Sequence, residues 1–193
     1  MKVRIAPVAI VIFTLLALSS CKKDDPAPLE AEVRGKLLAG EVDASKKWRL
    51  IGITLTSDSN PAQSLTLAGC FADNVYTFTN NASQDYQAAE GAAKCSTDSP
   101  DVIEKGNWSF TLDGLIVNIL VDETISGQGL FSSEILFFGD ADGNLVDAQI
   151  IGYPYPASVV SLTETGLTLE MNRTVVTTLG TSKLKYTLTF TSI

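Results

Sequence analysis

The feature that most constrains the fold is the strict alternation of apolar and polar residues near the end of the sequence. Over residues 183–191, Leu184, Tyr186, Leu188 and Phe190 alternate with lysines and threonines. A period of two places successive side chains on opposite faces, so the segment predicts a strand with one buried face. The same alternation runs through residues 107–112 and 167–172. Strands buried on one face only are typical of antiparallel sheets.

Further short candidate strands fill most of the sequence after residue 46. Asp-Gly, Gly-Asn and Asn-Asn pairs, which favour tight turns, separate them. These strands are expected at Lys47–Thr56, Asn74–Thr79, Gln84–Ala88, Leu115–Val121, Glu134–Phe138 and Leu145–Ile151. About nine or ten short strands in one domain predict a barrel or a sandwich.

One stretch before the strands has a helical pattern. Leu29, Val33 and Leu37 recur at every fourth position after a proline, and Gly40 follows them. Two glutamates stand in the first turn, where the helix dipole favours negative charge. We therefore expect a short helix within residues 29–39 that leads into the first strand and covers one end of a barrel.

The N-terminal residues have the pattern of a removable secretory signal. Lys2 and Arg4 precede an apolar run over residues 5–18. Fourteen helical residues span roughly 21 Å, less than the ~30 Å apolar layer of a membrane, so we expect no permanent transmembrane helix. The run ends in Leu-Ser-Ser-Cys, which resembles the lipobox of bacterial lipoproteins. The resemblance implies that residues 1–20 are cleaved off and that Cys21 is acylated.

Residues 21–28 combine charges with prolines and lack aromatic side chains. Such a segment buries too little apolar area to offset its ordering entropy, so we expect a lipidated tether. The lysines and aspartates after Cys21 resemble the surface-export signal of Bacteroidetes lipoproteins, and they fit a merely solvated linker equally well. We expect an outer-membrane lipoprotein of the cell envelope, on either leaflet. Without acylation, Cys21 would be a free or disulfide-paired thiol.

The charge balance and the absence of histidine exclude several function classes. Residues 1–20 contain two of the 14 basic residues and none of the 22 acidic ones, so the cleaved chain has a net charge of −10. Such a chain repels nucleic acids. Without histidine, Ser-His-Asp and Cys-His mechanisms and histidine-ligated metal sites are excluded. We expect no enzyme activity, metal or cofactor; a hydrolase that uses only carboxylates is the remaining catalytic alternative.

Cys70 and Cys95 remain after cleavage in a chain that is expected to leave the reducing cytoplasm. A disulfide between them is therefore the default expectation. It would close a loop of about 26 residues and stabilise the fold by about 3.5 kcal/mol in the chain-entropy model. A reactive thiol is disfavoured because the sequence has neither a histidine nor a Cys-x-x-Cys pair.

The order and spacing of the tryptophans, cysteines and strand starts carry a family resemblance. Residues 47–50, 73–78, 106–110, 158–163 and 166–169, together with Cys70 and Cys95, resemble the lipocalin-like domain of Bacteroidetes lipoproteins. The resemblance implies an all-β, antiparallel, lipocalin-like β-barrel of about 8–10 strands, over residues 46–193, with a short helix and connection over 29–45. Residues 122–157 exceed the usual connection of this family, which leaves the strand count open.

The same resemblance implies that the barrel binds a small apolar or amphipathic ligand. Strand parity directs Trp48, Phe78, Trp108, Phe110, Tyr186 and Phe190 inward, and Tyr153 and Tyr155 lie on a stiff Pro-containing loop that would border the mouth. The loop rings can instead pack on their own domain. The alternative function is a surface module for a protein or glycan partner, with a filled interior and an exposed apolar or aromatic patch. A hollow interior would favour the carrier.

Overall fold

The computed structural model describes residues 27–57, 62–65, 69–94, 97–98, 100–124, 129–131, 148–151, 155–177 and 180–193. The elements in these residues are, in order, α2 (Glu30–Ala39), β1 (Ser45–Ser57), β2 (Gln63–Leu65), α3 (Gly69–Ala72), β3 (Val75–Thr79), β4 (Asp85–Ala89), β5 (Val102–Phe110), β6 (Ile116–Thr124), β7 (Ala148–Ile151), β8 (Tyr155–Leu162), β9 (Gly166–Thr177) and β10 (Gly180–Ser192). Every strand pairing among them is antiparallel.

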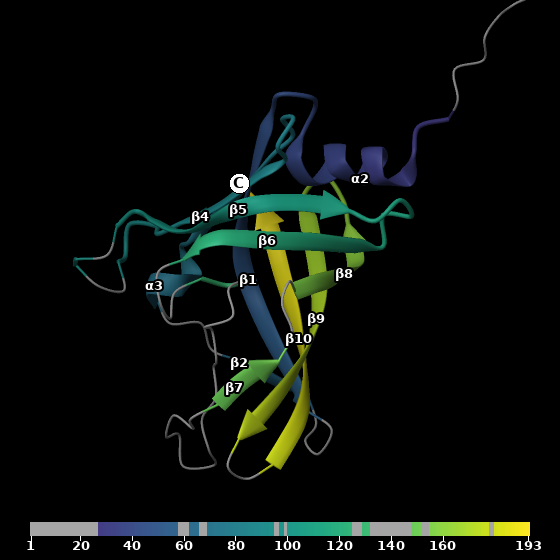
Figure 1. Cartoon of the computed structure of the whole chain (residues 1–193). Coiled ribbons are helices and arrows are strands. Elements are labelled where there is room, and N and C mark those ends of the chain that lie inside the picture. Colours follow the sequence, from purple (N-terminus) through teal and green to yellow (C-terminus); the bar gives the residue numbers. More distant parts are fainter. Residues whose placement is uncertain are drawn as a thin grey trace, which may run out of the picture.

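Eight of the described strands close into a barrel (Figure 1). They follow one another in the order β1, β3, β4, β5, β6, β8, β9 and β10, and β10 pairs back onto β1. The short strands β2 and β7 extend the sheet by pairing with β1 and β9. The structure is therefore the all-β, antiparallel, lipocalin-like barrel preceded by a short helix that the sequence predicts.

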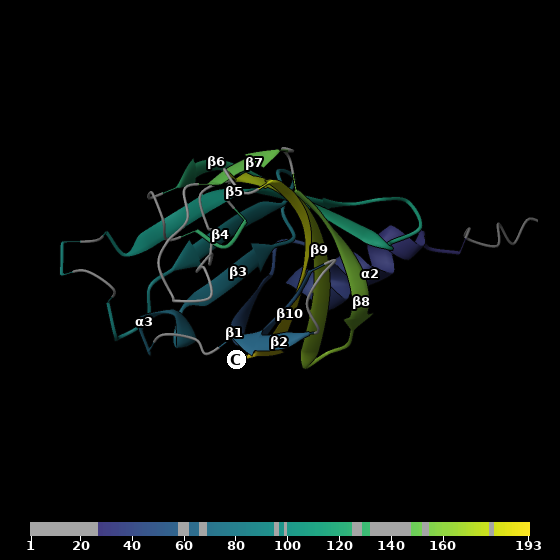
Figure 2. The same cartoon turned by 90° about the horizontal axis from the view of Figure 1, so that it is seen from below.

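Register shifts bend the long strands around the interior. One shift lies between Leu50 and Gly52 in β1, and another between Lys105 and Gly106 in β5. Such bulges increase twist and help a sheet to close. A Cβ atom at position 106 would lie 1.9 Å from the backbone oxygen of Leu120 on β6, so only glycine allows this approach. Figure 2, viewed from the side away from α2, shows the strands curving around a common interior.

Helix α2 lies across one end of the barrel (Figure 1). The Trp48 indole Nε1 donates a buried hydrogen bond of 2.8 Å to the Leu38 oxygen, and Lys46 Nζ donates to the Leu37 oxygen at 2.8 Å. Asn80, after β3, donates from Nδ2 to the Gly40 oxygen at 2.8 Å. These bonds use carbonyls near the C-terminal end of the helix, which lack partners within it. They fix α2 over the start of β1 and the end of β3, as the sequence predicts.

The buried side chains of the core are those that the alternation along the strands directs inward. Its buried members include the side chains of Trp48, Phe78, Trp108, Tyr186 and Phe190, and Phe110 packs partly buried against them. The rings of Phe78 and Trp108 meet edge to face at 6.4 Å between centroids, and those of Trp108 and Phe110 at 5.8 Å. The candidate ligand contacts thus face inward as expected. In the half of the barrel that α2 covers, the rings of Phe78, Trp108 and Phe110 pack on one another.

Several elements differ from the sequence expectation. The short strand β2, the single helical turn α3 and the full length of β8 are not foreseen by periodicity, because each is too short or lacks regular alternation. Of the expected strand at Leu145–Ile151, residues 148–151 form β7, whereas the expected strand at Glu134–Phe138 lies outside the described residues. Part of the 122–157 stretch forms the end of β6, β7 and the start of β8.

Candidate functional site

A buried carboxylate lies inside the barrel in the half away from α2. Glu104, near the start of β5, is 1 % exposed. Its Oε2 accepts hydrogen bonds from the Tyr86 hydroxyl at 2.8 Å and from the Leu130 amide at 3.1 Å, and its Oε1 accepts from the Phe131 amide at 2.9 Å. A buried charge is tolerated only when it is paired and hydrogen-bonded, and these three donors meet part of that need.

A buried cation shares this region. Arg173, on β9, is 4 % exposed, and its Nη2 donates to the Leu130 oxygen at 3.3 Å. The guanidinium carbon lies 5.6 Å from the ring centroid of Tyr186 on β10, a distance at which a cation is attracted to the ring face. Residues 130 and 131 therefore contact both buried charges, Glu104 through two amides and Arg173 through a carbonyl.

Two further buried polar side chains point into the barrel. The hydroxyl of Tyr186 is buried and has no hydrogen-bond partner among the residues that the structure describes. The Asn74 amide is also buried, and it lies close enough to the Tyr76 hydroxyl to oppose the rise that burial causes in the pKa of that tyrosine. Asn74 is 1 % exposed and directly precedes β3. We call Asn74, Tyr86, Glu104, Arg173 and Tyr186 the polar cluster. Because buried polar groups in native proteins are normally satisfied, the Tyr186 hydroxyl marks a place for an external polar partner.

The polar cluster keeps its tyrosines protonated. Burial raises the pKa of the Tyr86 hydroxyl well above its usual value, and the negative charge of Glu104 raises it further. Burial likewise raises the pKa of Tyr186, although the positive charge of Arg173 partly opposes this shift. Both hydroxyls therefore remain hydrogen-bond donors at neutral pH. Tyr86 donates to Glu104, and Tyr186 has its donor to offer.

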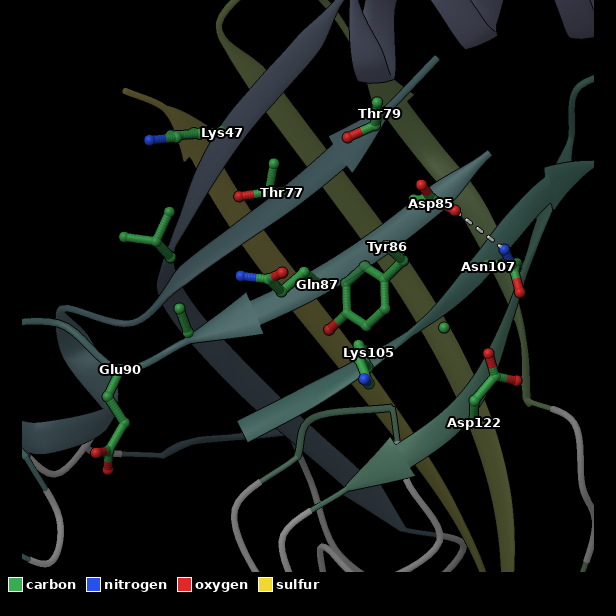
Figure 3. Close-up of a pocket in the computed structure, with 13 residues that line it drawn as sticks. Lys47, Thr77, Thr79, Asp85, Tyr86, Gln87, Glu90, Lys105, Asn107 and Asp122 are labelled. Carbon is green, nitrogen blue, oxygen red and sulfur yellow. Dashed lines mark hydrogen bonds between the residues drawn. The ribbon is translucent and has the colours of Figure 1, made fainter. Parts of the chain in front are cut away.

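A hollow lies on the outer face of the barrel (Figure 3). This outer groove encloses about 750 Å³, and five neighbouring strands, β1 and β3–β6, border it. Its walls are mostly polar and include Lys47, Thr77, Asp85, Gln87 and Lys105. The two lysines lie on a cross-strand row with Thr77 and Gln87 between them. Hydrogen bonds from Asn81 and Ser83 lower the pKa of Asp85, so this carboxyl is not a proton donor at neutral pH.

Another hollow, of about 410 Å³, lies between α2 and the barrel. Trp108 and Phe110 border it from β5, and Gly35 borders it from the helix. A Cβ atom on Gly35 would lie 3.5 Å from the Trp108 ring, so helix and ring are already in close contact. This hollow is the place where two of the predicted aromatic contacts reach toward the surface.

Some of the predicted site residues lie in the described structure, and others lie outside the described residues. Tyr186 belongs to the polar cluster, whereas Trp48, Phe78 and Phe190 lie in the apolar core. Tyr155 begins β8, and Cys70 lies half-buried in α3. Cys21, Cys95 and Tyr153 lie outside the described residues, so the acylation, the disulfide and the position of Tyr153 stay predictions.

Sequence reasoning did not single out Glu104 or Arg173. Glu104 lies an even number of positions from Trp108 and Phe110, the inward residues of its strand. Arg173 is placed in the same way relative to Leu169 and Met171. A charged residue at an inward position was therefore the signal that could have revealed them. Asn74 gives a weaker signal, because an asparagine before a strand is ordinary in a turn.

The described part of the chain contains no group of three or more histidine, cysteine, aspartate or glutamate side chains arranged to hold a metal ion. Its helices are too short or too polar to cross a bilayer. No protein-family model matches this chain, and no curated protein matches it either.

Proposed function

We propose that this chain is an outer-membrane lipoprotein of the cell envelope, tethered through acylated Cys21, whose barrel binds a small apolar or amphipathic ligand. An eight-strand barrel of lipocalin-like form is a fold that can hold a ligand, but fold alone does not identify one. The tether rests on the lipobox resemblance at Leu-Ser-Ser-Cys. We place the ligand's polar group at the polar cluster, and propose binding as the function, with no catalysis.

The observation that carries the ligand proposal is the unpartnered buried hydroxyl of Tyr186, in the same cluster as the buried Asn74 amide. A buried polar group without a partner costs about 1–3 kcal/mol, so it is expected to persist only where something else satisfies it. Apolar side chains of the core surround this end, which suits the apolar part of an amphipathic molecule. A buried water is the competing account, because water also satisfies such groups.

Tyr186→Phe separates the two accounts. It removes the unpartnered hydroxyl and keeps the ring, so the free protein should be as stable as the unchanged one or more stable by about 1 kcal/mol, whereas affinity for a hydrogen-bonding ligand should fall about 5–10-fold. Leu112→Ala, at a side chain that is 77 % exposed, is the control and should change neither. Urea unfolding and fluorescence titration with dodecanoate, cholesterol and an apolar amide measure both effects.

Native mass spectrometry of protein released from its own envelope supplies the direct test. A bound mass that is lost or weakened in Tyr186→Phe supports the carrier. Preparations without bound mass, together with flat titrations for all three probes, would overturn it. The anchor is tested separately: Cys21→Ser should abolish incorporation of labelled fatty acid and release the protein from outer membranes, and unchanged labelling of this variant would overturn the lipoprotein proposal.

The outer groove supports one second candidate, a surface module for a protein or glycan. Its volume of about 750 Å³ and its row of polar side chains on neighbouring strands offer hydrogen bonds over an extended surface. Gln87→Ala combined with Thr77→Ala would remove the middle of this row. Loss of binding to envelope glycans or proteins in that variant, with ligand titrations unchanged, would favour the module over the carrier.

A further inference from the structure

A piece of the chain itself occupies the interior beside the polar cluster. Residues 129–131 are buried there, and Phe131 is fully enclosed. The Phe131 ring meets the Tyr86 ring edge to face, with 5.5 Å between centroids and an interplanar angle of 83°. Leu130 is a member of the same hydrophobic core. The segment therefore sits in the barrel as two apolar side chains on a short stretch of peptide backbone.

Three backbone polar groups of this segment are hydrogen-bonded to the two buried charges. Glu104 accepts one hydrogen bond from each of the Leu130 and Phe131 amides, at 3.1 Å and 2.9 Å. Arg173 donates to the Leu130 carbonyl at 3.3 Å. The carboxylate accepts from two N–H groups, and the guanidinium donates to the C=O group between them. Together they form a site that is complementary to a neutral amide.

We infer that the ligand of the barrel is an apolar, peptide-like amide that takes the place of Leu130 and Phe131. This inference rests on the proposed ligand-binding function. A molecule that displaces the segment should replace its two N–H donors, because Glu104 otherwise keeps only the Tyr86 hydroxyl of these three donors, and the loss of donors to a buried carboxylate is unfavourable. A fatty acid brings a second negative charge and no donor. A peptide-like molecule with two amide N–H groups supplies both donors and an acceptor for Arg173, and its remaining polar groups can meet Asn74 and Tyr186.

The probe that follows from this geometry is N-acetyl-leucyl-phenylalanine amide, which reproduces the two side chains, the two N–H groups and the carbonyl of the segment. Its matched control is the ester analogue, in which an oxygen replaces the phenylalanine N–H. Titrated into the full-length mature protein, the amide should bind about tenfold or more tightly than the ester, because the ester leaves Glu104 one donor short. Glu104→Gln should reduce this preference.

The unsubstituted protein gives a readout that no folding defect can confound. When the amide binds, the backbone N–H resonances of Leu130 and Phe131 should shift away from their hydrogen-bonded positions. The two N–H groups should also become open to hydrogen exchange. Leu130→Ala combined with Phe131→Ala weakens the competing segment and should raise the affinity for the amide about tenfold. Leu115→Ala, at an exposed side chain, should leave it unchanged.

The outcomes separate this inference from the proposed function. Equal binding of amide and ester, or amide binding that leaves the Leu130 and Phe131 signals in place, would overturn the inference. Binding of dodecanoate alone would also overturn it, and would leave the carrier proposal standing. Absence of binding by every probe, in the unsubstituted protein and in the double alanine variant, would overturn both.

Discussion

Replacing Phe78 by alanine tests whether the barrel is filled next to α2. Phe78 is 2 % exposed, and its ring centroid lies 5.1 Å from that of Tyr86 and 6.4 Å from that of Trp108. Truncating a phenylalanine in a packed core costs about 3–5 kcal/mol, from lost transfer energy and the cavity that remains. Each of the two ring contacts adds about 0.5–1.5 kcal/mol, which favours the upper end of that range. In a hollow lumen the ring would border open space, and the cost would be about 1.5 kcal/mol.

The free energy of unfolding in urea, followed by tryptophan fluorescence and near-ultraviolet circular dichroism, measures this cost. Ile51→Ala is the control, because Ile51 is 58 % exposed on a neighbouring strand and its truncation should change stability by about 0.5 kcal/mol at most. A cost below about 1.5 kcal/mol for Phe78→Ala, with an unchanged urea dependence, would refute a filled interior. The ligand would then have room beside the aromatic side chains as well as at the polar cluster.

Three further predictions concern other parts of the barrel. Gly106→Ala should destabilise the protein by about 1–3 kcal/mol in urea unfolding, because the added Cβ meets the backbone of β6, whereas Gly52→Ala, whose Cβ would lie 4.0 Å from its nearest neighbour, should be tolerated. Cys70→Ala and Cys95→Ala should each lower stability by about 3.5 kcal/mol and should not be additive, and free thiols at both positions by mass spectrometry would contradict the disulfide. Burial and a neighbouring carboxylate raise the pKa of Tyr86 in the folded protein. The stabilising contribution of the neutral hydroxyl is therefore complete below pH 10 and is lost as the pH rises through the pKa of the folded state. The phenolate absorbance of Tyr86 should appear only together with unfolding.

Strand parity was the part of the fold that could be predicted from the sequence. The alternation at residues 183–191 and 167–172 gives β10 and β9 and their inward residues, because one side of each strand must face the core. The helical spacing and the following glycine likewise give α2 to within one residue at its start. What periodicity could not give was the order of strands around the ring, since pairing depends on contacts distant in sequence.

The candidate site was harder to predict for the same physical reason. Parity indicates that Glu104 and Arg173 face inward, but it does not indicate what they meet there. Their partners are Leu130 and Phe131, which are separated from Glu104 by more than 25 positions and lie in a stretch without alternation. The outer groove was also hidden, because its lining residues come from five strands and form no motif in any one of them.

The selectivity of such a site would come mainly from the hydrogen bond that Glu104 loses when a ligand lacks one donor. A hydrophobic pocket distinguishes ligands that differ by one methylene only about 10–200-fold, because the lost contact is small. A site built to pair buried hydrogen-bonding groups rejects an analogue that lacks one donor more strongly, since a protein group then remains buried and unpaired. In this barrel, that group is a carboxylate that is 1 % exposed. The ester should therefore be a worse ligand than an amide shortened by one methylene, although the ester resembles the parent amide more closely in shape.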